Sequence, residues 1–229
     1  MSEVNGLNIV AHELKAPLSL VRQLAFSLDY VNSISESDKI KSEIINVSER
    51  ALRTVNDLTK ISRLEDGLFV FEPVSIRNVC SEVESELRYL YRFEDKNIKM
   101  KFSNKSRLVI ANHELLFSVI YNFASNALRY SDKNSTAILT VKDSKKKVKI
   151  EVRDFGPALP KTIYEKLKND SLTAPTDISL RPDSSGHGLF IASKFARFMN
   201  ADVGAVRHKD GTSFYVSLPA SAQATLFSL

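Results

Sequence analysis

The sequence is poor in residues that define several structural classes. Its 229 residues include no tryptophan, one cysteine, 7 glycines and 7 prolines. The composition, 43% hydrophobic and 26% charged, excludes fibrous and disordered chains and is that of an ordinary globular protein. The lone Cys80 excludes an intramolecular disulfide and a four-ligand cysteine–histidine metal site. The chain therefore suits a reducing compartment, and its length predicts one or two folding units.

Long apolar runs and charge of a single sign are also missing. No run of about 18 apolar residues occurs and no signal peptide precedes the first helical pattern, so we expect a soluble, cytoplasmic polypeptide. The formal net charge is +5, but basic and acidic residues are interleaved along almost the whole chain. Residues 145–147 form one short lysine run, which is typical of a solvated hairpin turn. We therefore expect no nucleic-acid partner.

The N-terminal segment has the apolar periodicity of two helices. From Val4 to Leu28 apolar residues recur at steps of three and four, which predicts one long amphipathic helix. After the polar stretch Asn32–Asp38, two sets of residues are spaced seven apart: Ile44, Ala51 and Leu58, and beside them Val47, Thr54 and Ile61. One antiparallel hairpin cannot bury all of these stripes, so we predict a homodimer in which two hairpins form a four-helix bundle.

The pattern changes at Gly67, where a glycine ends the helix and a strand-like segment with a proline follows. We place a domain boundary there, with a helical hairpin at 1–66 and an α/β domain at 67–229. Its predicted elements are helices at 76–92, 114–130 and 188–199, and strands at 99–104, 107–111, 137–143, 147–154, 202–208 and 212–218. Because strands and helices do not alternate regularly, the fold class is α + α/β, with a mixed sheet covered by helices on one face. The segment 156–186 is long enough to be a lid.

A histidine lies beside an acid in the first helix. The segment HELKAPL contains His12, Glu13 and, five residues after the histidine, Pro17. Proline removes a helical hydrogen bond and crowds the preceding turn, so we expect a kink that exposes His12. A neutral imidazole is a nucleophile and Glu13 could take the proton from its second nitrogen, which makes the pair a workable phosphoryl acceptor. A histidine that only packs in or on the bundle is the alternative interpretation.

Two asparagines share one face of the helix predicted at 114–130. The segment NFASNALRYS places Asn122 and Asn126 four residues apart, with Arg129 and Tyr130 one turn further on. Carboxamide oxygens beside a core can hold Mg²⁺ that also bridges nucleotide phosphates. Arginine could meet a phosphate, and tyrosine could stack on a base. Asparagines that only cap or pack the helix are the alternative.

Two further segments place polar groups at the ends of predicted elements. The strand KKVKIEV is followed by Asp154 and Gly156, so a carboxylate that can accept from an exocyclic amine emerges where the chain turns. The letters DFG do not indicate a protein kinase here, because the chain has neither a glycine-rich loop after a first strand nor an HRD segment. Gly186 and Gly188 directly precede a helix, whose free amides suit phosphate oxygens. A glycine that only lets the chain turn is the alternative.

Taken in order, HELKAPL, NFASNALRYS, DFGPALP and SSGHGLFIA resemble the four sequence boxes of sensor histidine kinases with an ATP-binding domain of the Bergerat type. The resemblance spans nearly the entire chain and includes ISRLEDGLFVFEPVSI between the domains and GTSFYVSLP near the end. It implies the cytoplasmic core of such a kinase: a dimerisation and phosphoacceptor hairpin followed by a Bergerat α/β sandwich. Any membrane attachment would use a segment that this chain does not contain.

The resemblance also implies a role for each matching residue. His12 would accept the γ-phosphoryl group of ATP with Glu13 as general base, and the phosphate would pass to an aspartate of a response regulator receiver domain. The enzyme would be an ATP-dependent protein-histidine kinase, and Asn126 with Asn122 would coordinate its Mg²⁺. The remaining positions would contact the nucleotide: Arg129, Tyr130, Asp154, Gly156, Gly186 and Gly188.

Some positions depart from the pattern of this family. Ala16 stands four residues after the histidine, where threonine or asparagine is usual, so we expect weak phosphatase activity toward the phosphorylated regulator. Ala158 and Ser184 stand where glycines are common, and the aromatic pair of the lid is represented by Tyr164 and Leu167. A catalytically weakened homologue that acts as a dimeric scaffold is therefore the alternative function. A Bergerat-type ATPase without histidine transfer is a third, against which the HELKAP hairpin argues.

Overall fold

The computed structural model describes residues 2–64, 66–102, 108–144, 146–169 and 187–220, with side chains described from residue 14 onward. The chain divides into two compact units, Met1–Gly67 and Leu68–Leu229. The boundary that we predicted lies beside this division, and the functions predicted for the two segments stay predictions. None of the described helices combines the length and the apolar character that a membrane span requires.

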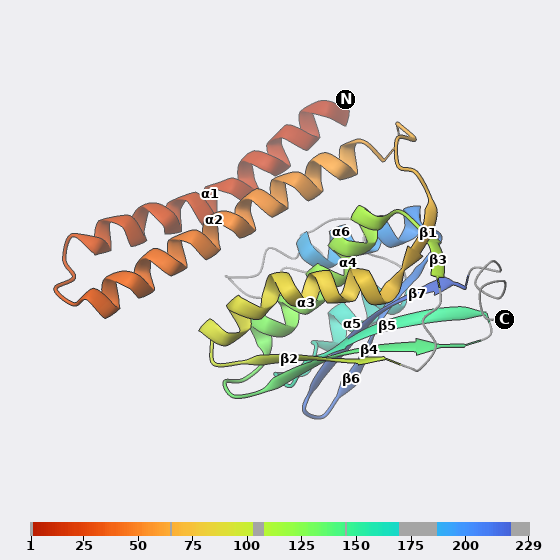
Figure 1. Ribbon diagram of the computed structural model, residues 1–229. Coiled ribbons are helices and arrows are strands. Elements are labelled where there is room, and N and C mark those ends of the chain that lie inside the picture. The colour runs from red at the N-terminus through yellow and green to blue at the C-terminus, as the bar shows by residue number, and fades with distance from the viewer. Residues whose placement is uncertain (1, 65, 103–107, 145, 170–186, 221–229) are drawn as a thin grey trace. The chain divides into compact units, whose positions relative to one another are not determined.

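The first unit is a hairpin of two long helices that run antiparallel and pack on each other (Figure 1). Helix α1 spans Ser2–Leu28 and continues through Pro17, and α2 spans Ile34–Ser62. We predicted a connection as far as Asp38, and this was wrong because the second helix begins within the polar stretch. Glu36 lies in its first turn, where an acidic side chain favours helix initiation. The kink beside the histidine stays a prediction.

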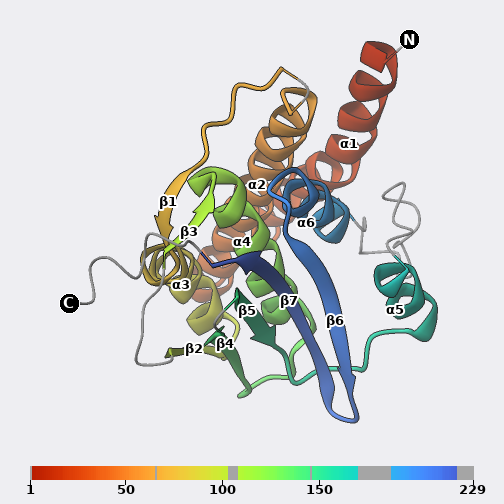
Figure 2. The ribbon, with the colours of Figure 1, turned by 90° about the vertical axis from the view of Figure 1, so that its right-hand side faces the viewer.

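The second unit is an α/β sandwich in which helices cover one face of a sheet (Figure 2). The five strands of this sheet follow the order β2-β4-β5-β7-β6, and only the β2–β4 pair is parallel. The predicted mixed sheet with helices on one face is therefore confirmed. The strands are β1 (Glu72–Ser75), β2 (Asn97–Phe102), β3 (Leu108–Ala111), β4 (Thr136–Asp143), β5 (Lys147–Arg153), β6 (Asp202–His208) and β7 (Gly211–Pro219). The helices are α3 (Ile76–Phe93), α4 (His113–Tyr130), α5 (Lys161–Lys168) and α6 (His187–Phe198).

The unit also contains a second, smaller sheet. Strands β1 and β3 form a separate antiparallel pair, with Val74 opposite Val109. Both valines are buried, so the small sheet closes one end of the core. The two strands of this small sheet are distant in the sequence, so the apolar periodicity of the sequence did not predict their pairing.

Helix α4 is the central helix of the unit and is fixed at both ends. Its Phe123 ring stacks on Phe214 of β7 with 5.8 Å between ring centroids. At its start the Asn112 side chain caps the helix by accepting from a backbone amide. Near its end the Tyr91 hydroxyl and the buried Lys96 ammonium each donate to a backbone carbonyl of α4 at 2.7 Å. The two asparagines of the predicted site are therefore carried on an anchored helix.

Candidate nucleotide site

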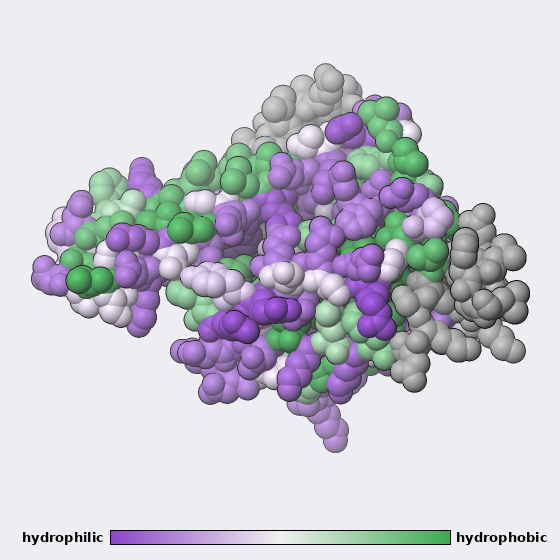
Figure 3. Space-filling view, viewed as in Figure 1, coloured by the Kyte–Doolittle hydropathy of each residue, from purple (hydrophilic) through white to green (hydrophobic). Residues whose placement is uncertain are grey.

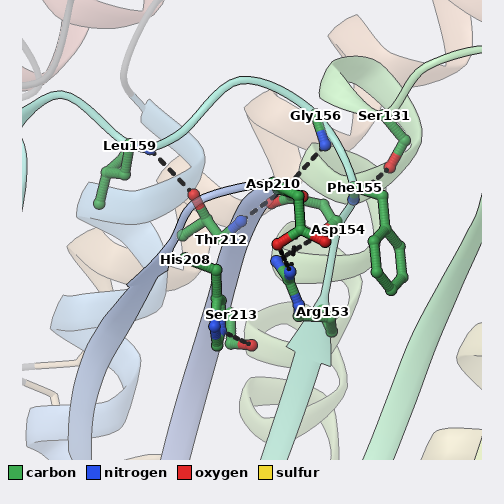
Figure 4. A network of polar contacts seen from close by, with 10 residues as sticks. All are labelled: Ser131, Arg153, Asp154, Phe155, Gly156, Leu159, His208, Asp210, Thr212 and Ser213. Carbon is green, nitrogen blue, oxygen red and sulfur yellow. Dashed lines mark hydrogen bonds and ion pairs between the residues drawn. The ribbon is translucent and has the colours of Figure 1, made fainter.

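The carboxylate predicted to receive an exocyclic amine lies directly after the end of β5. Asp154 is 3% exposed. Its Oδ1 accepts from the backbone amides of Thr212, at 2.9 Å, and Gly156, at 3.3 Å, and its own amide donates to the Thr212 carbonyl at 2.8 Å (Figure 4). Both amide donors bind the same oxygen. They hold the carboxylate in one orientation without using Oδ2.

Burial and charge act in opposite directions on this carboxyl group. Burial raises the pKa of Asp154, while its hydrogen bonds to the amides of Thr212 and Gly156 and the charges of Arg153 and His208 oppose that rise. Only the ionised carboxylate is purely an acceptor. The two amide donors and the nearby positive charges therefore favour the ionised carboxylate, which is the form that can accept a hydrogen bond from an amino group through either oxygen.

The ends of β5 and β7 supply contacts that our sequence analysis missed. Nη1 of Arg153 donates to the Asp154 carbonyl at 2.6 Å, and Nη2 donates to Oδ1 of Asp210 at 2.7 Å. The Thr212 hydroxyl accepts from the Leu159 amide at 3.0 Å, which ties the segment after Asp154 to β7. The Gly-Thr pair that begins GTSFYVSLP was the available signal, but we interpreted it only as the start of a strand.

Gly211 allows the close approach of the two strand ends. Its φ is +132°, a value that favours glycine. A Cβ placed on it would lie 2.4 Å from the Asp154 carbonyl oxygen and 2.7 Å from Oδ1. Any side chain at position 211 would therefore displace the predicted adenine acceptor.

The turn after Asp154 packs on the end of α4. A Cβ at Gly156 would lie 1.9 Å from the Tyr130 carbonyl oxygen, so the turn accepts only glycine. The Phe155 amide donates to Oγ of Ser131 at 3.4 Å, beside the same helix end. Gly156 and Tyr130, two residues of the predicted site, are thus adjacent in space. The close approach that Gly156 permits here is that of the chain itself, and approach by a nucleotide stays a prediction.

A second group of predicted residues meets where α4 contacts the start of α6. Nδ2 of Asn122 donates to the Ser118 carbonyl at 2.8 Å. Oδ1 of Asn122 lies 2.9 Å from the position of a Cβ on Gly188. The carboxamide oxygen thus faces the first turn of α6, and Asn126 lies half-buried one turn further along α4. Amide oxygens are ligands that Mg²⁺ accepts, so this set of donors fits the ion.

For the remaining predicted residues the structure shows fewer contacts with the site. The exposed Arg129 has its guanidinium carbon 5.9 Å from the centroid of the Tyr130 ring. His12 and Glu13 lie on α1, in the other unit, and their side chains are outside the described residues, as are Gly186 and Ser184. On α5, Leu167 is buried and Tyr164 is half-buried.

Known proteins that resemble this chain are histidine kinases. Residues 111–222 match the family described as histidine kinase-, DNA gyrase B-, and HSP90-like ATPase. The chain is 27% identical over 230 residues to an uncharacterised sensor-like histidine kinase, ycf26, of Porphyra purpurea, covering 91% of this chain and 34% of the relative. It is 26% identical over 207 residues to the signal transduction histidine-protein kinase BarA of Escherichia coli strain K12, covering 85% and 22%. The chain thus spans about a third or less of these two relatives.

Two solved structures share the fold. The Acinetobacter baumannii histidine kinase AdeS has a TM-score of 0.64 at 14% identity, covering 91% of this chain and 97% of that one. Full-length ShkA in complex with AMPPNP has a TM-score of 0.64 at 23% identity, covering 95% and 46%. The family match begins at residue 111 and does not include the hairpin. Residues 111–222 match the histidine kinase-, DNA gyrase B- and HSP90-like ATPase family, and the chain is similar in sequence to sensor histidine kinases and in fold to a solved histidine kinase structure.

Proposed function

We propose that the second unit binds ATP, that the γ-phosphoryl group is transferred to His12, and that it then passes to an aspartate of a response regulator receiver domain. The named relatives are histidine kinases, and the ShkA structure is a complex with AMPPNP, which supports a nucleotide in the corresponding unit here. The cytoplasmic location expected from the sequence stays a prediction.

The observation that carries this proposal is the arrangement around Asp154. A buried carboxylate at a strand end costs free energy unless it is hydrogen-bonded. Here two backbone amides bind one of its oxygens, and the exocyclic amine of adenine is a suitable donor for the other. The base would then lie near the end of α4, where Tyr130 could stack on it.

The phosphates would lie toward the start of α6. Asn126 and Asn122 would hold Mg²⁺ through their carboxamide oxygens, and Arg129 would contact a phosphate. Bound Mg²⁺ supplies positive charge that offsets the charge of the phosphates. Gly188 would let the amides of the first turn of α6 approach phosphate oxygens, and Gly186 would extend this cradle under the lid.

The transfer itself needs a nucleophile and a proton acceptor. One imidazole nitrogen of His12 would form a bond to the γ-phosphorus while the bond from phosphorus to the bridging oxygen breaks and ADP leaves. Glu13 would take the proton from the second nitrogen. In the next step the N–P bond breaks as the regulator aspartate forms an acyl phosphate. Positioning and charge neutralisation would supply most of the rate acceleration.

We also propose that the hairpin forms a homodimer. Apolar side chains lie at the surface of the hairpin, as the green areas over α1 and α2 show in Figure 3. Ile45 is 56% exposed and Leu52, seven residues later, is 65% exposed. Large apolar side chains spaced by a heptad favour a partner helix, so a second hairpin is the simplest cover.

Incubation with γ-labelled ATP and Mg²⁺ tests the kinase proposal. We expect label on the protein that survives base and is lost in acid, as a phosphoramidate requires. The His12→Gln variant should incorporate no label and still bind ATP, since the nucleotide site lies in the other unit. Label that persists in His12→Gln would contradict the proposal. ATP binding without label in the native chain would favour the scaffold function, and steady release of phosphate without label would favour an ATPase.

A further inference from the structure

Arg153, the last residue of β5, contacts three residues near the end of that strand: Asp154, Phe155 and Asp210. Its Nη1 donates to the Asp154 carbonyl at 2.6 Å, and its Nη2 bonds Oδ1 of Asp210 at 2.7 Å. Its guanidinium carbon lies 4.6 Å from the centroid of the Phe155 ring. The arginine thus contacts the aspartate, the residue after it and the β6–β7 turn (Figure 4).

The two ends of this ion pair differ in exposure. The Arg153 side chain is 13% exposed, whereas the Asp210 side chain is 68% exposed. An exposed pair contributes little to stability, but a guanidinium with low exposure loses much of its hydration and needs its hydrogen bonds. Asp210 and the Asp154 carbonyl supply them. The pair therefore fixes the relative position of the strand end and of the turn that leads to Gly211 and Thr212.

We infer that Arg153, braced by Asp210, is a positioning residue that makes the nucleotide site select adenine over guanine. This inference rests on the proposed ATP binding and names a determinant of its specificity. Arg153 acts through Asp154, because it hydrogen-bonds the backbone carbonyl of that residue and Asp210 in the neighbouring turn.

The selection follows from the hydrogen-bonding groups of the two bases. Adenine presents an amino group at its 6-position, and guanine presents a carbonyl oxygen there. An ionised carboxylate in a fixed orientation accepts from the amine and repels the carbonyl oxygen. If the carboxylate could rotate, or could take up a proton, it would discriminate less between the two bases. The positive charge of Arg153 and its hold on the Asp154 carbonyl oppose both changes.

Competition binding of ATP and GTP against a fluorescent ATP analogue, with the full chain and Mg²⁺, tests this inference. The native chain should bind ATP more tightly than GTP. In Arg153→Gln we expect ATP affinity to fall about tenfold, equivalent to about 1.4 kcal/mol, while GTP affinity changes little. Asp210→Asn keeps the arginine but removes its brace, so it should reduce the ATP-to-GTP ratio in the same direction by a smaller factor.

Arg88→Gln is the matched control, because Arg88 is likewise paired with a carboxylate, that of Glu84 at 3.1 and 2.8 Å, but on α3. It should leave the ATP-to-GTP ratio at the native value. The inference is overturned if the native chain binds both nucleotides equally, or if Arg153→Gln weakens both by the same factor, as a merely structural role would. If the native chain binds no ATP, the proposed function fails first, which the native measurement alone reveals.

Discussion

The hairpin and the sheet unit bury their apolar residues to different degrees. In the described part of the hairpin, the buried residues are Val47, Ala51 and Asp57. In the sheet unit, helices α3, α4 and α6 and both sheets contribute fully buried side chains. Among the hairpin side chains that the structure describes, the exposed large apolar ones are Leu18, Leu20, Phe26, Tyr30, Ile34, Ile45 and Leu52.

This difference separates two sources of stability. Burial of apolar surface is the main favourable contribution to folding, and the sheet unit achieves it within one chain. The hairpin leaves much of its apolar surface exposed, and large exposed apolar patches are typical of interaction sites. We therefore expect the stability of the hairpin to depend on protein concentration and that of the sheet unit to be independent of it.

The largest effect should come from a cavity in the sheet unit. Phe123 is fully buried and stacks on Phe214. Phe123→Ala should lower the free energy of unfolding by about 3–5 kcal/mol, because the transfer free energy of the ring is lost and a cavity is left in its place. Urea unfolding followed by circular dichroism measures this loss. The control is Phe26→Ala on the hairpin, where the side chain is 63% exposed. An equal loss in both variants would contradict the comparison.

The next effect concerns the exposed stripe of the hairpin. In the double variant Ile45→Glu and Leu52→Glu, charges replace apolar side chains that we expect at the dimer interface. The dimer dissociation constant should rise at least about a hundredfold, since the loss of burial of even one such side chain, about 1.5–3 kcal/mol, changes the constant by about ten- to a hundredfold. Sedimentation equilibrium measures the constant. Tyr89→Glu, at a residue that is 63% exposed on α3, should leave it unchanged. Unchanged association in the double variant would refute the proposed interface.

Local signals in the sequence predicted most of the fold. Apolar periodicity gave helices α3, α4 and α6 and strands β2 to β7 to within two residues in the described segments, because it reports which face each element buries. It failed at the start of α2, where the stretch looked like a loop because it is polar. Charged residues also suit the first turn of an exposed helix, so polarity alone does not distinguish the two.

The candidate site was predicted only where each residue belongs to a contiguous motif. Asp154 and Gly156 are next to each other in the sequence, and Asn122 and Asn126 share a helix face. Thr212 lies 58 residues after the carboxylate that it binds, and that contact exists only once β5 and β7 are paired. Such contacts depend on strand register, which the sequence does not display.

A substitution on α1 tests whether the hairpin surface takes part in dephosphorylation. Ala16 is exposed. A threonine hydroxyl there could hydrogen-bond a hydrolytic water, which a methyl group cannot do. Ala16→Thr should accelerate dephosphorylation of the phosphorylated regulator about three- to tenfold, the value of one added hydrogen bond. Loss of labelled phosphate from the regulator measures the rate, with Ala16→Val as the control for size. Equal rates in the two variants would reject the role of the hydroxyl.

The smallest effect should come from Asp154→Asn, which separates stability from binding inside the sheet unit. Burial raises the pKa of Asp154 in the folded chain above its unfolded value. A raised pKa means that the contribution of this group to stability is fully present below the unfolded pKa and is lost as the pH rises through the folded pKa. At neutral pH the ionised aspartate therefore destabilises the fold relative to a neutral residue that accepts the same amide hydrogen bonds.

We expect Asp154→Asn to melt slightly higher than the native chain at pH 7, and this gain should shrink as the pH falls toward the unfolded pKa. The same variant should bind ATP more weakly, because the asparagine oxygen would accept from the two backbone amides and its Nδ2, a donor, would then face the amino group of the base. Thermal melts from about pH 4, near the unfolded pKa of an aspartate, up to pH 7 measure the first effect. Asp202→Asn, at a side chain that is 67% exposed, is the control. If the variant instead melted lower than the native chain at pH 7, the ionised carboxylate would stabilise the fold. The expectation that the charge of Asp154 lowers stability would then be wrong.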